Sequence, residues 1–206
     1  MAGKNIPLDK KVKENEPEII PAIRNRWSPR AFSDKPVDKQ DLLRLFEAAR
    51  WAPSSFNEQP WRFIVGIRGD ETYEKIRSTF VDWNLGWTDR VNVLVLIASK
   101  TYFELDGREN KHNMWDAGSA AGNIAIQATE LGLYCHQMAG LDTGKADKIF
   151  EMPEGFKIRT AMAIGHLGDL EDLKEDYKEG ETAERTRKPL EELVFTDGLQ
   201  TAFDFS

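Results

Sequence analysis

The spacing of apolar residues along this chain predicts helices and strands in a mixed order. Residues 17–25 are expected to form a first helix. After Asp38, a suitable N-cap, apolar residues recur at the i, i+3, i+4, i+7 spacing of one helical face. The members of that face are Leu42, Leu45, Phe46 and Ala49. Pro53 is expected to end this second helix, because proline has no N–H to continue the helical hydrogen bonds.

Four stretches have the pattern of strands. Residues 61–67 alternate between apolar and other side chains, and Asp70 beyond them can cap a further helix. Residues 93–98 are continuously apolar, which is typical of a central strand that is buried on both faces. Two more strands are predicted at 134–139 and 159–165. Helices and strands in this order predict an α+β fold.

The clearest helix is predicted at 113–131. Its apolar face consists of Ala117, Ala121, Ile124, Ala128 and Leu131. Gly118 and Gly122 leave another side nearly bare, although glycine inside a helix costs about 1 kcal/mol. This pair indicates that another backbone or a ligand comes close, and ordinary tight packing within one subunit is the alternative.

The chain is expected to form one domain over residues 17–196. Residues 1–16 are polar and are expected to be a flexible lead-in. Residues 101–112 have the composition of a loop or lid, and residues 169–184, in which acids far outnumber lysines, are expected to be a solvated segment. The tail at 197–206 is rich in aromatic residues, which suggests that it packs on a partner subunit.

Composition and charge narrow the function classes. Of 206 residues, 40% are hydrophobic and 31% charged, as in ordinary soluble proteins, and the net charge of −7 argues against nucleic acid or an anionic membrane as a partner. The single cysteine, Cys135, fits a cytoplasmic protein and is more plausible as a small buried hydrophobe than as a catalytic thiol. We find no dinucleotide-binding glycine motif, phosphate-binding P-loop, metal-ligand spacing or nucleophile elbow.

The segment from Arg26 to Arg30 is the first candidate for binding chemistry. Pro29 biases the residue before it away from helix, so the segment is expected to be extended. Arg26, Ser28 and Arg30 then share one face, and two guanidinium groups with a hydroxyl between them can grip a phosphate or a carboxylate. A solvated surface segment with two exposed arginines is the alternative.

Six sequence segments in this order resemble the nitroreductase family of FMN-dependent oxidoreductases over about residues 17 to 196. These segments are RWSPR at 26–30, APSSFNEQPWRF at 52–63, the stretch from DAG to LGL at 116–133, MAGLD at 138–142, IGH at 164–166 and RTRKPL at 185–190. The resemblance implies a sandwich with a central, mostly antiparallel sheet flanked by helices, and a long central helix at the interface of a homodimer. It also implies two FMN sites, each lined by both subunits.

The resemblance also implies which residues bind FMN. The first phosphate and ribityl contacts match Arg26, Trp27, Ser28 and Arg30, and the C-terminal phosphate contacts match Arg185 and Arg187. The stretch that reaches the flavin from the partner subunit matches Pro53, Ser54, Ser55, Asn57 and Gln59. The flavin-facing turn matches Ala139 and Gly140, although some members carry an acidic residue where Ala139 stands. Asn57 has the alternative role of holding its own loop.

The chemistry that the resemblance implies is carried by the cofactor. NADH or NADPH would reduce FMN, and a nitroaromatic, a quinone or a similar small molecule would then be reduced in a ping-pong exchange without a catalytic side chain. Relatives in this superfamily suggest other reactions: reductive dehalogenation, flavin fragmentation and azoline oxidation. A Glu–Tyr–Lys set for halotyrosines is present only in the wrong order, as Tyr102, Glu104 and Lys111. A flavin-binding sensor or structural dimer without turnover is a third hypothesis.

Overall fold

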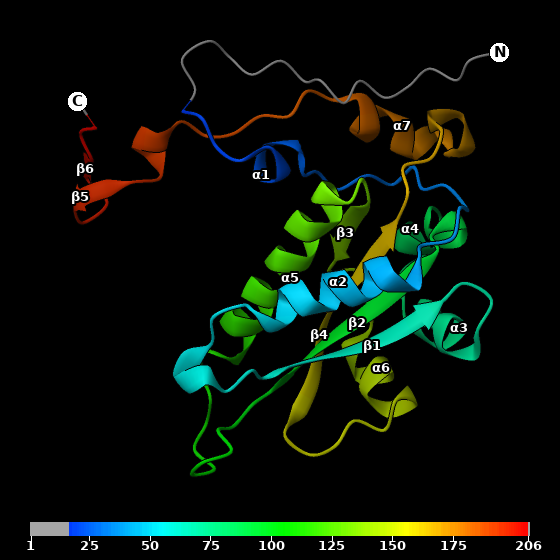
Figure 1. Ribbon diagram of the computed structural model, residues 1–206, viewed down its shortest axis with the longest axis horizontal. Coiled ribbons are helices and arrows are strands. Elements are labelled where there is room, and N and C mark those ends of the chain that lie inside the picture. The colour runs from blue at the N-terminus through cyan, green and yellow to red at the C-terminus, as the bar shows by residue number, and fades with distance from the viewer. Residues whose placement is uncertain (1–16, 206) are drawn as a thin grey trace.

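The computed structural model describes residues 17–205, which form a four-stranded sheet with helices on both faces (Figure 1). The strands are β1 (Trp61–Ile67), β2 (Val93–Lys100), β3 (Tyr134–Met138) and β4 (Phe156–Gly165). They lie in the order β1-β2-β4-β3, and every neighbouring pair is antiparallel. This arrangement confirms the predicted α+β fold with an antiparallel central sheet.

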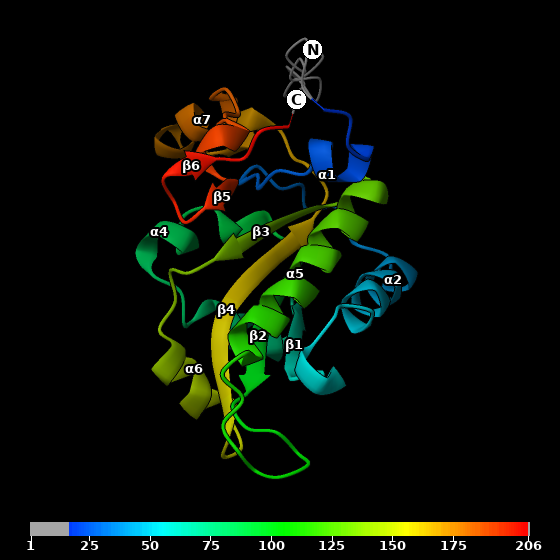
Figure 2. The same cartoon turned by 90° about the vertical axis from the view of Figure 1, so that its left-hand side faces the viewer.

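Within residues 17–205, helices cover both faces of the sheet, two on each face (Figure 1, Figure 2). The helices are α1 (Pro21–Asn25), α2 (Lys39–Arg50), α3 (Glu71–Arg77), α4 (Asp82–Leu85), α5 (Asn113–Glu130), α6 (Thr143–Ile149) and α7 (Glu175–Thr182). Apolar residues of α2 and α5 share one core cluster, and those of α3, α6 and α7 share the second. Figure 2 shows α2 and α5 on one side of the strands and α6 on the other. The long helix α5 is therefore part of the outer layer, with one side against the sheet.

Strand β2 lies between β1 and β4 and is buried along its whole length. Val93, Val95 and Ile97 point into the core under α5, because alternate residues of a strand face opposite sides. Leu94 and Leu96 point into the opposite core. The continuous apolar run therefore forms a central strand that is packed on both faces, as predicted.

The predicted helix starts are confirmed. The Asp38 carboxylate accepts a hydrogen bond of 2.7 Å from the Gln40 N–H at the start of α2. The Asp70 carboxylate accepts one of 2.6 Å from the Tyr73 N–H at the start of α3. Both side chains satisfy N–H groups that have no partner within the helix.

Two predicted boundaries and one prediction of solvent exposure were wrong. The first helix spans only Pro21–Asn25, since proline at its first position starts the helix there, and residues 17–20 are not helical. Strand β4 begins at Phe156, three residues earlier than expected. The segment 169–184 is not simply solvated, because it contains α7 and buries Tyr177 and Glu181.

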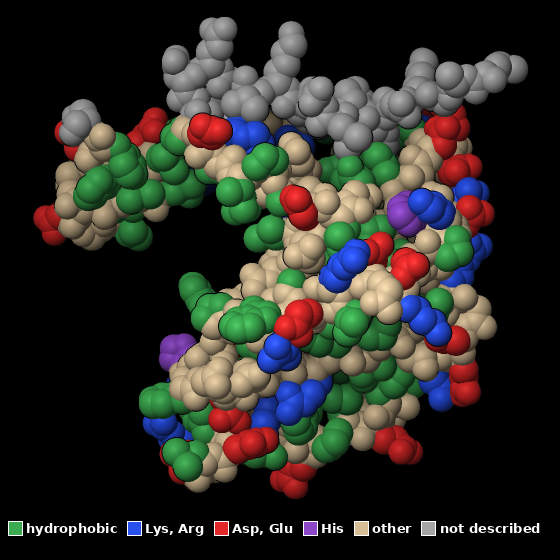
Figure 3. Space-filling model, viewed as in Figure 1, with side chains coloured by type: hydrophobic (Ala, Val, Ile, Leu, Met, Phe, Trp, Pro, Cys, Tyr) green, Lys and Arg blue, Asp and Glu red, His purple; other side chains and the backbone are tan. Residues whose placement is uncertain are grey.

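The C-terminal residues form an arm that projects from the body of the molecule (Figure 1). Its hairpin pairs β5 (Phe195–Asp197) with β6 (Thr201–Ala202), and so spans the boundary expected between residues 196 and 197. Figure 3 shows a wide hollow between the arm and the body. Leu199 and Phe205 are exposed on this arm, and its packing on a partner subunit stays a prediction. The expected lead-in at 1–16 lies outside the described residues.

None of the helices within residues 17–205 is long and apolar enough to cross a membrane.

Candidate functional site

Three arginines from two distant segments meet beside β3. An Nη2 of Arg185 donates hydrogen bonds of 2.8 Å to the Arg24 carbonyl and 2.9 Å to the Arg26 carbonyl. Burial lowers the pKa of Arg26, and the positive charge of Arg187 lowers it further. The pKa of Arg185 is lowered by burial and by the charges of Arg187 and Arg26. The structure thus brings together one predicted residue from the first segment and both from the last.

This arginine cluster (Arg26, Arg185 and Arg187) has no carboxylate partner among residues 17–205. Like charges that are held together and partly desolvated are unfavourable unless an anion binds between them. The hydroxyl of Ser28 lies 3.4 Å from Nη1 of Arg26 and adds a polar group at the same place. The donor set suits a ligand with several negative oxygens, such as a phosphate.

Arg30 has a different environment from the cluster. The Glu181 carboxylate, which is 1% exposed, accepts hydrogen bonds from the backbone N–H groups of Arg30 (2.7 Å) and Ala31 (3.3 Å). An Nη1 of Arg30 lies 3.9 Å from the same carboxylate. The charge of Arg30 is therefore partly balanced by Glu181 of α7. Sequence reasoning missed Glu181, since nothing distinguishes it from the exposed acids around it.

The segment 26–30 runs beside β3, which leads to the predicted flavin-facing turn. The rings of Trp27 and Tyr134 meet edge to face with centroids 6.2 Å apart. Nδ1 of His136 lies 2.9 Å from the Pro29 carbonyl oxygen. Because β3 ends at Met138, the turn at 139–140 follows directly from this contact region. The arginine cluster and the turn are thus arranged along one edge strand of the sheet.

The turn itself is fixed by α4. The Gly140 carbonyl accepts hydrogen bonds from the Val81 N–H (3.1 Å) and from Nδ2 of Asn84 (2.9 Å). A Cβ at position 140 would stand 2.7 Å from that Nδ2 and 2.9 Å from Cγ2 of Val81. A larger residue here would therefore displace the Asn84 and Val81 side chains that pack against the turn. The Gly140 N–H has no acceptor within the described part of the chain, so it is available to a ligand.

The predicted partner-reaching stretch forms a tight turn at the other end of the molecule. Its 3-10 turn spans Ser55–Asn57, and the Asp116 carboxylate of α5 accepts a 3.1 Å hydrogen bond from the Ser55 N–H. Figure 1 shows this turn near the start of α5, whereas α1 and the segment 26–30 lie near the end of that helix. Pro53, Ser54, Ser55, Asn57 and Gln59 therefore do not meet the arginine cluster within one chain.

The Asn57 side chain does not hold its own loop. It is exposed, and it makes no hydrogen bond to any of residues 17–205, although the backbone carbonyl of Asn57 accepts one of 3.1 Å from Nε2 of Gln59. An exposed amide that can both donate and accept is free to contact a ligand or a second chain.

The face of α5 that carries Gly118 and Gly122 is open. A Cβ at either position would meet nothing within 4 Å. Met114 and Trp115, near the start of the same helix, are 59% and 80% exposed. Tight packing within the described part of one subunit therefore does not explain these glycines, and the close approach of another backbone or a ligand stays a prediction.

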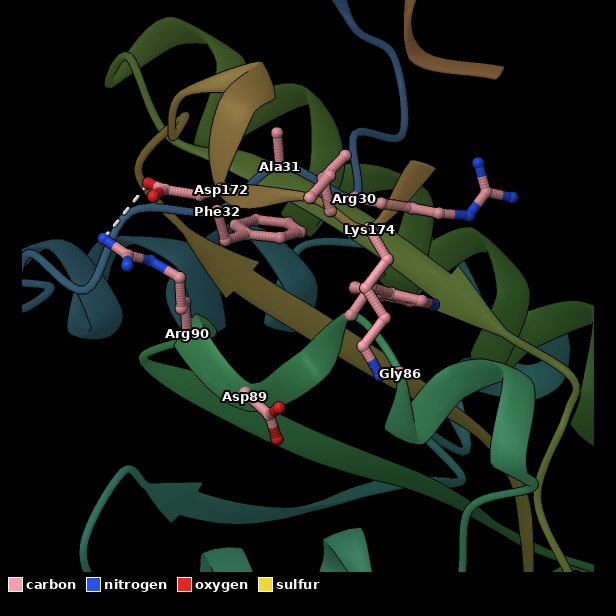
Figure 4. Close-up of a pocket in the computed structure, with 10 residues that line it drawn as sticks. Arg30, Ala31, Phe32, Gly86, Asp89, Arg90, Asp172 and Lys174 are labelled. Atoms are coloured by element: carbon pink, nitrogen blue, oxygen red, sulfur yellow. Dashed lines mark ion pairs between the residues drawn. The ribbon is translucent and has the colours of Figure 1, made fainter. Parts of the chain in front are cut away.

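A cavity of about 200 Å³ lies behind Arg30, lined on one side by Phe32 and Trp87. Arg90 and Asp172 form an ion pair of 3.2 Å at its edge, and Figure 4 shows Arg30 extending away from that pair. Lys174 and Asp89 add one charge of each sign. This balance of charge distinguishes the cavity from the arginine cluster, and gives it no comparable attraction for an anion.

Cys135 and His136, which are neighbours on β3, are both unsuited to proton transfer at neutral pH. Burial raises the pKa of the Cys135 thiol to about 12, an effect that Arg26 only partly opposes. Burial lowers the pKa of His136 to about 4, against a hydrogen bond to Pro29 that favours the charged form. Cys135 is 4% exposed, which fits the expected small buried hydrophobe. The described residues contain no group of three or more side chains that could hold a metal ion.

Replacing His136 should change how stability depends on pH. The pKa of His136 is about 4 in the folded protein and 6.5 in the unfolded chain. The unfolded chain therefore binds more protons than the folded protein between these pH values. Lowering the pH through this window therefore destabilises the parent, by about 2.5 kcal/mol at pH 4.5. In urea unfolding at pH 7.5 and 4.5, His136→Gln should lose correspondingly less stability than the parent. Equal losses in both proteins would show that His136 is not kept neutral by the fold.

Comparisons with known proteins place these features in context. The model of the nitroreductase family matches residues 23–85 and 68–166. A 15.4 kDa protein encoded in the ask 5′ region of Mycolicibacterium smegmatis is 32% identical over 143 residues, covering 66% of this chain and 95% of that protein. The major NAD(P)H-flavin oxidoreductase of Aliivibrio fischeri is 26% identical over 218 residues, covering 85% of this chain and 97% of its own.

A solved structure shares both sequence and fold with this chain. It is described as an oxidoreductase containing FMN, has 32% sequence identity and superposes with a TM-score of 0.84. The match covers 92% of this chain and 96% of that one.

Proposed function

This chain belongs to the nitroreductase family, and we propose that it is an FMN-dependent oxidoreductase that passes electrons from NADH or NADPH to a nitroaromatic, a quinone or a similar small acceptor. The observation that carries this proposal is the arginine cluster, three cations held together without a carboxylate among the described residues. FMN, unlike riboflavin, has a phosphate that such a cluster can bind. The FMN in the related solved structure supports the same cofactor.

The residues around the cluster fit the rest of the cofactor. Arg26, Arg185 and Arg187 would hold the phosphate, with Ser28 and the backbone of Trp27 beside it. Arg30 would lie at the edge of this phosphate site, with its charge partly balanced by Glu181. The free N–H of Gly140 would face the ring, where a positioned donor stabilises negative charge on the reduced flavin. Ala139 would contribute only backbone.

A second copy of the chain would complete each site. The turn that carries Asn57 lies near the start of α5, whereas the segment 26–30 lies near the end of that helix (Figure 1). The turn therefore does not reach the arginine cluster of its own chain. The open face of α5 around Gly118 offers a surface on which a second backbone can come close. The exposed apolar residues of the arm offer another. Together these features support a homodimer in which the turn of each subunit reaches the flavin of the other.

The side chains described above bind and orient, and none is assigned a proton-transfer role. When bound, FMN supplies the hydride and electron transfer chemistry. The thiol of Cys135 stays protonated and the imidazole of His136 stays neutral at pH 7, as their pKa values of about 12 and 4 require. The protein's contribution is then to hold the phosphate, donate to the ring and leave one face open to donor and acceptor in turn.

The purified protein should take up FMN and be bleached by NADH or NADPH under anaerobic conditions. Addition of a quinone or a nitroaromatic should restore the yellow colour, and steady-state rates should give parallel double-reciprocal lines. Cys135→Ser should perform both half-reactions at close to the parental rate, because the buried thiol has no part in them. A protein that binds FMN but is not bleached by either nucleotide would contradict the proposed function and favour a flavin-binding sensor.

A further inference from the structure

The turn that carries Asn57 has an unusual backbone. Three residues other than glycine adopt positive φ within four positions: Phe56 (54°), Asn57 (56°) and Gln59 (50°). The left-handed conformation costs about 1 kcal/mol or more for each such residue. A turn of this kind persists only when surrounding contacts determine its shape.

Some of these contacts lie within the turn. The Asn57 N–H donates to the Ser54 carbonyl (3.0 Å), and the Gln59 N–H donates to the Ser54 hydroxyl (3.0 Å). The Glu58 N–H donates to the Ser55 carbonyl (3.1 Å). These hydrogen bonds close the turn on itself, but they do not fix it to the sheet.

A buried ion pair joins the turn to the sheet. The side chain of Glu58 is 9% exposed and that of Lys100, the last residue of β2, is 5% exposed. Nζ of Lys100 lies 3.6 Å from Oε1 of Glu58. The same oxygen accepts a 3.0 Å hydrogen bond from the Glu104 N–H, and the Glu104 carboxylate also contacts Nζ.

Lys100 holds the turn at two points. Its backbone N–H donates a 2.9 Å hydrogen bond to the Pro60 carbonyl, directly after the turn, and its ammonium group holds Glu58 inside it. Asn57 and Gln59 flank Glu58, so the position of both depends on this attachment. The segment 101–112 adds to the same support, because Arg108 lies over the Phe56 ring at 5.0 Å.

We propose that Lys100 is a positioning residue that acts through Glu58 to hold the Asn57 turn in the shape in which it reaches the flavin of the second subunit. The inference rests on the proposed function for its ligand. A lysine is rarely buried without a reason, since its desolvation is repaid only by close partners. Here those partners are Glu58 from the turn and Glu104 from the segment 101–112.

The test compares Lys100→Met, Glu58→Gln and the double variant with the parent. Lys100→Met leaves the buried Glu58 carboxylate without its lysine, and Glu58→Gln leaves the buried Lys100 ammonium without that carboxylate. The double variant removes both charges and should therefore be thermally more stable than either single variant. Hydrogen exchange of the apoprotein should still be at least about tenfold faster at residues 57–59 of the double variant, with α5 unchanged. With FMN bound, its visible circular dichroism should differ from the parent, and anaerobic reduction by NADPH should be about tenfold slower.

Lys157→Met is the matched control, because Lys157 lies opposite Ser99 on the next strand and its exposed side chain forms a 3.5 Å ion pair with Asp147. It should leave exchange, dichroism and reduction rate as in the parent. If the double variant matches this control in exchange and dichroism, the pair serves only general stability and the inference is wrong, while the proposed function stands. A parent that takes up no FMN would overturn both, whatever the exchange shows.

Discussion

Replacing both Arg26 and Arg187 with alanine should weaken FMN binding at least about a hundredfold and leave riboflavin binding little changed. Hydrogen bonds to charged groups contribute about 1.5 to 3 kcal/mol each, so two of them account for a factor of about a hundred or more. The two charges also repel each other in the apoprotein: burial lowers the pKa of Arg26 most, and the charge of Arg187 lowers it further. The apo variant should therefore unfold at the parental temperature or slightly above it. Equilibrium titration with both flavins and thermal unfolding measure these effects.

A double replacement of Arg44 and Arg50 is the control. It removes the same net charge from the exposed side of α2, where each arginine already has a carboxylate partner. Its FMN affinity should stay within a few-fold of the parent. If the Arg26 and Arg187 variant loses FMN and riboflavin equally, the cluster does not hold the phosphate.

Gly118→Arg should convert a dimer into a folded monomer that binds FMN at least about a hundredfold more weakly. Within one chain the new side chain meets nothing within 4 Å, and arginine favours helix over glycine by close to 1 kcal/mol. Between two chains the same side chain would enter the closely packed face of α5. Sedimentation of the parent at micromolar concentration should give twice 23.5 kDa. The variant should sediment as one chain with an unchanged far-UV spectrum.

Gly144→Arg provides the comparison, because Gly144 is also exposed in a helix and a Cβ there meets only a carboxylate oxygen of Asp142 at 3.5 Å. This variant should remain dimeric and keep its flavin. A Gly118→Arg protein that remains dimeric would exclude the dimer interface on α5, and a monomeric one that still binds FMN tightly would exclude a site shared between subunits.

The sequence by itself determined the main elements and their order. The two-sided burial of β2 follows from its continuous apolar run, and the starts of α2 and α3 follow from Asp38 and Asp70. These features are local, because periodicity and capping depend on residues a few positions apart. The resemblance, carried by short segments in a fixed order, pointed to Arg26, Arg185 and Arg187, which the structure brings together although about 160 residues separate them.

Only the tertiary structure decided which charges are paired and which are free. Arg26 and Arg30 stand four positions apart in the same motif, but α7 brings the buried Glu181 to Arg30 and leaves Arg26 beside two other arginines. Lys100 and Glu58 likewise become a buried pair only because β2 ends beneath the Asn57 turn. The energy of a charge depends on its distance from other charges and on its burial, and long-range packing sets both. The motif therefore marked candidate anion-binding arginines, while the fold determined which of them have no carboxylate partner among the described residues.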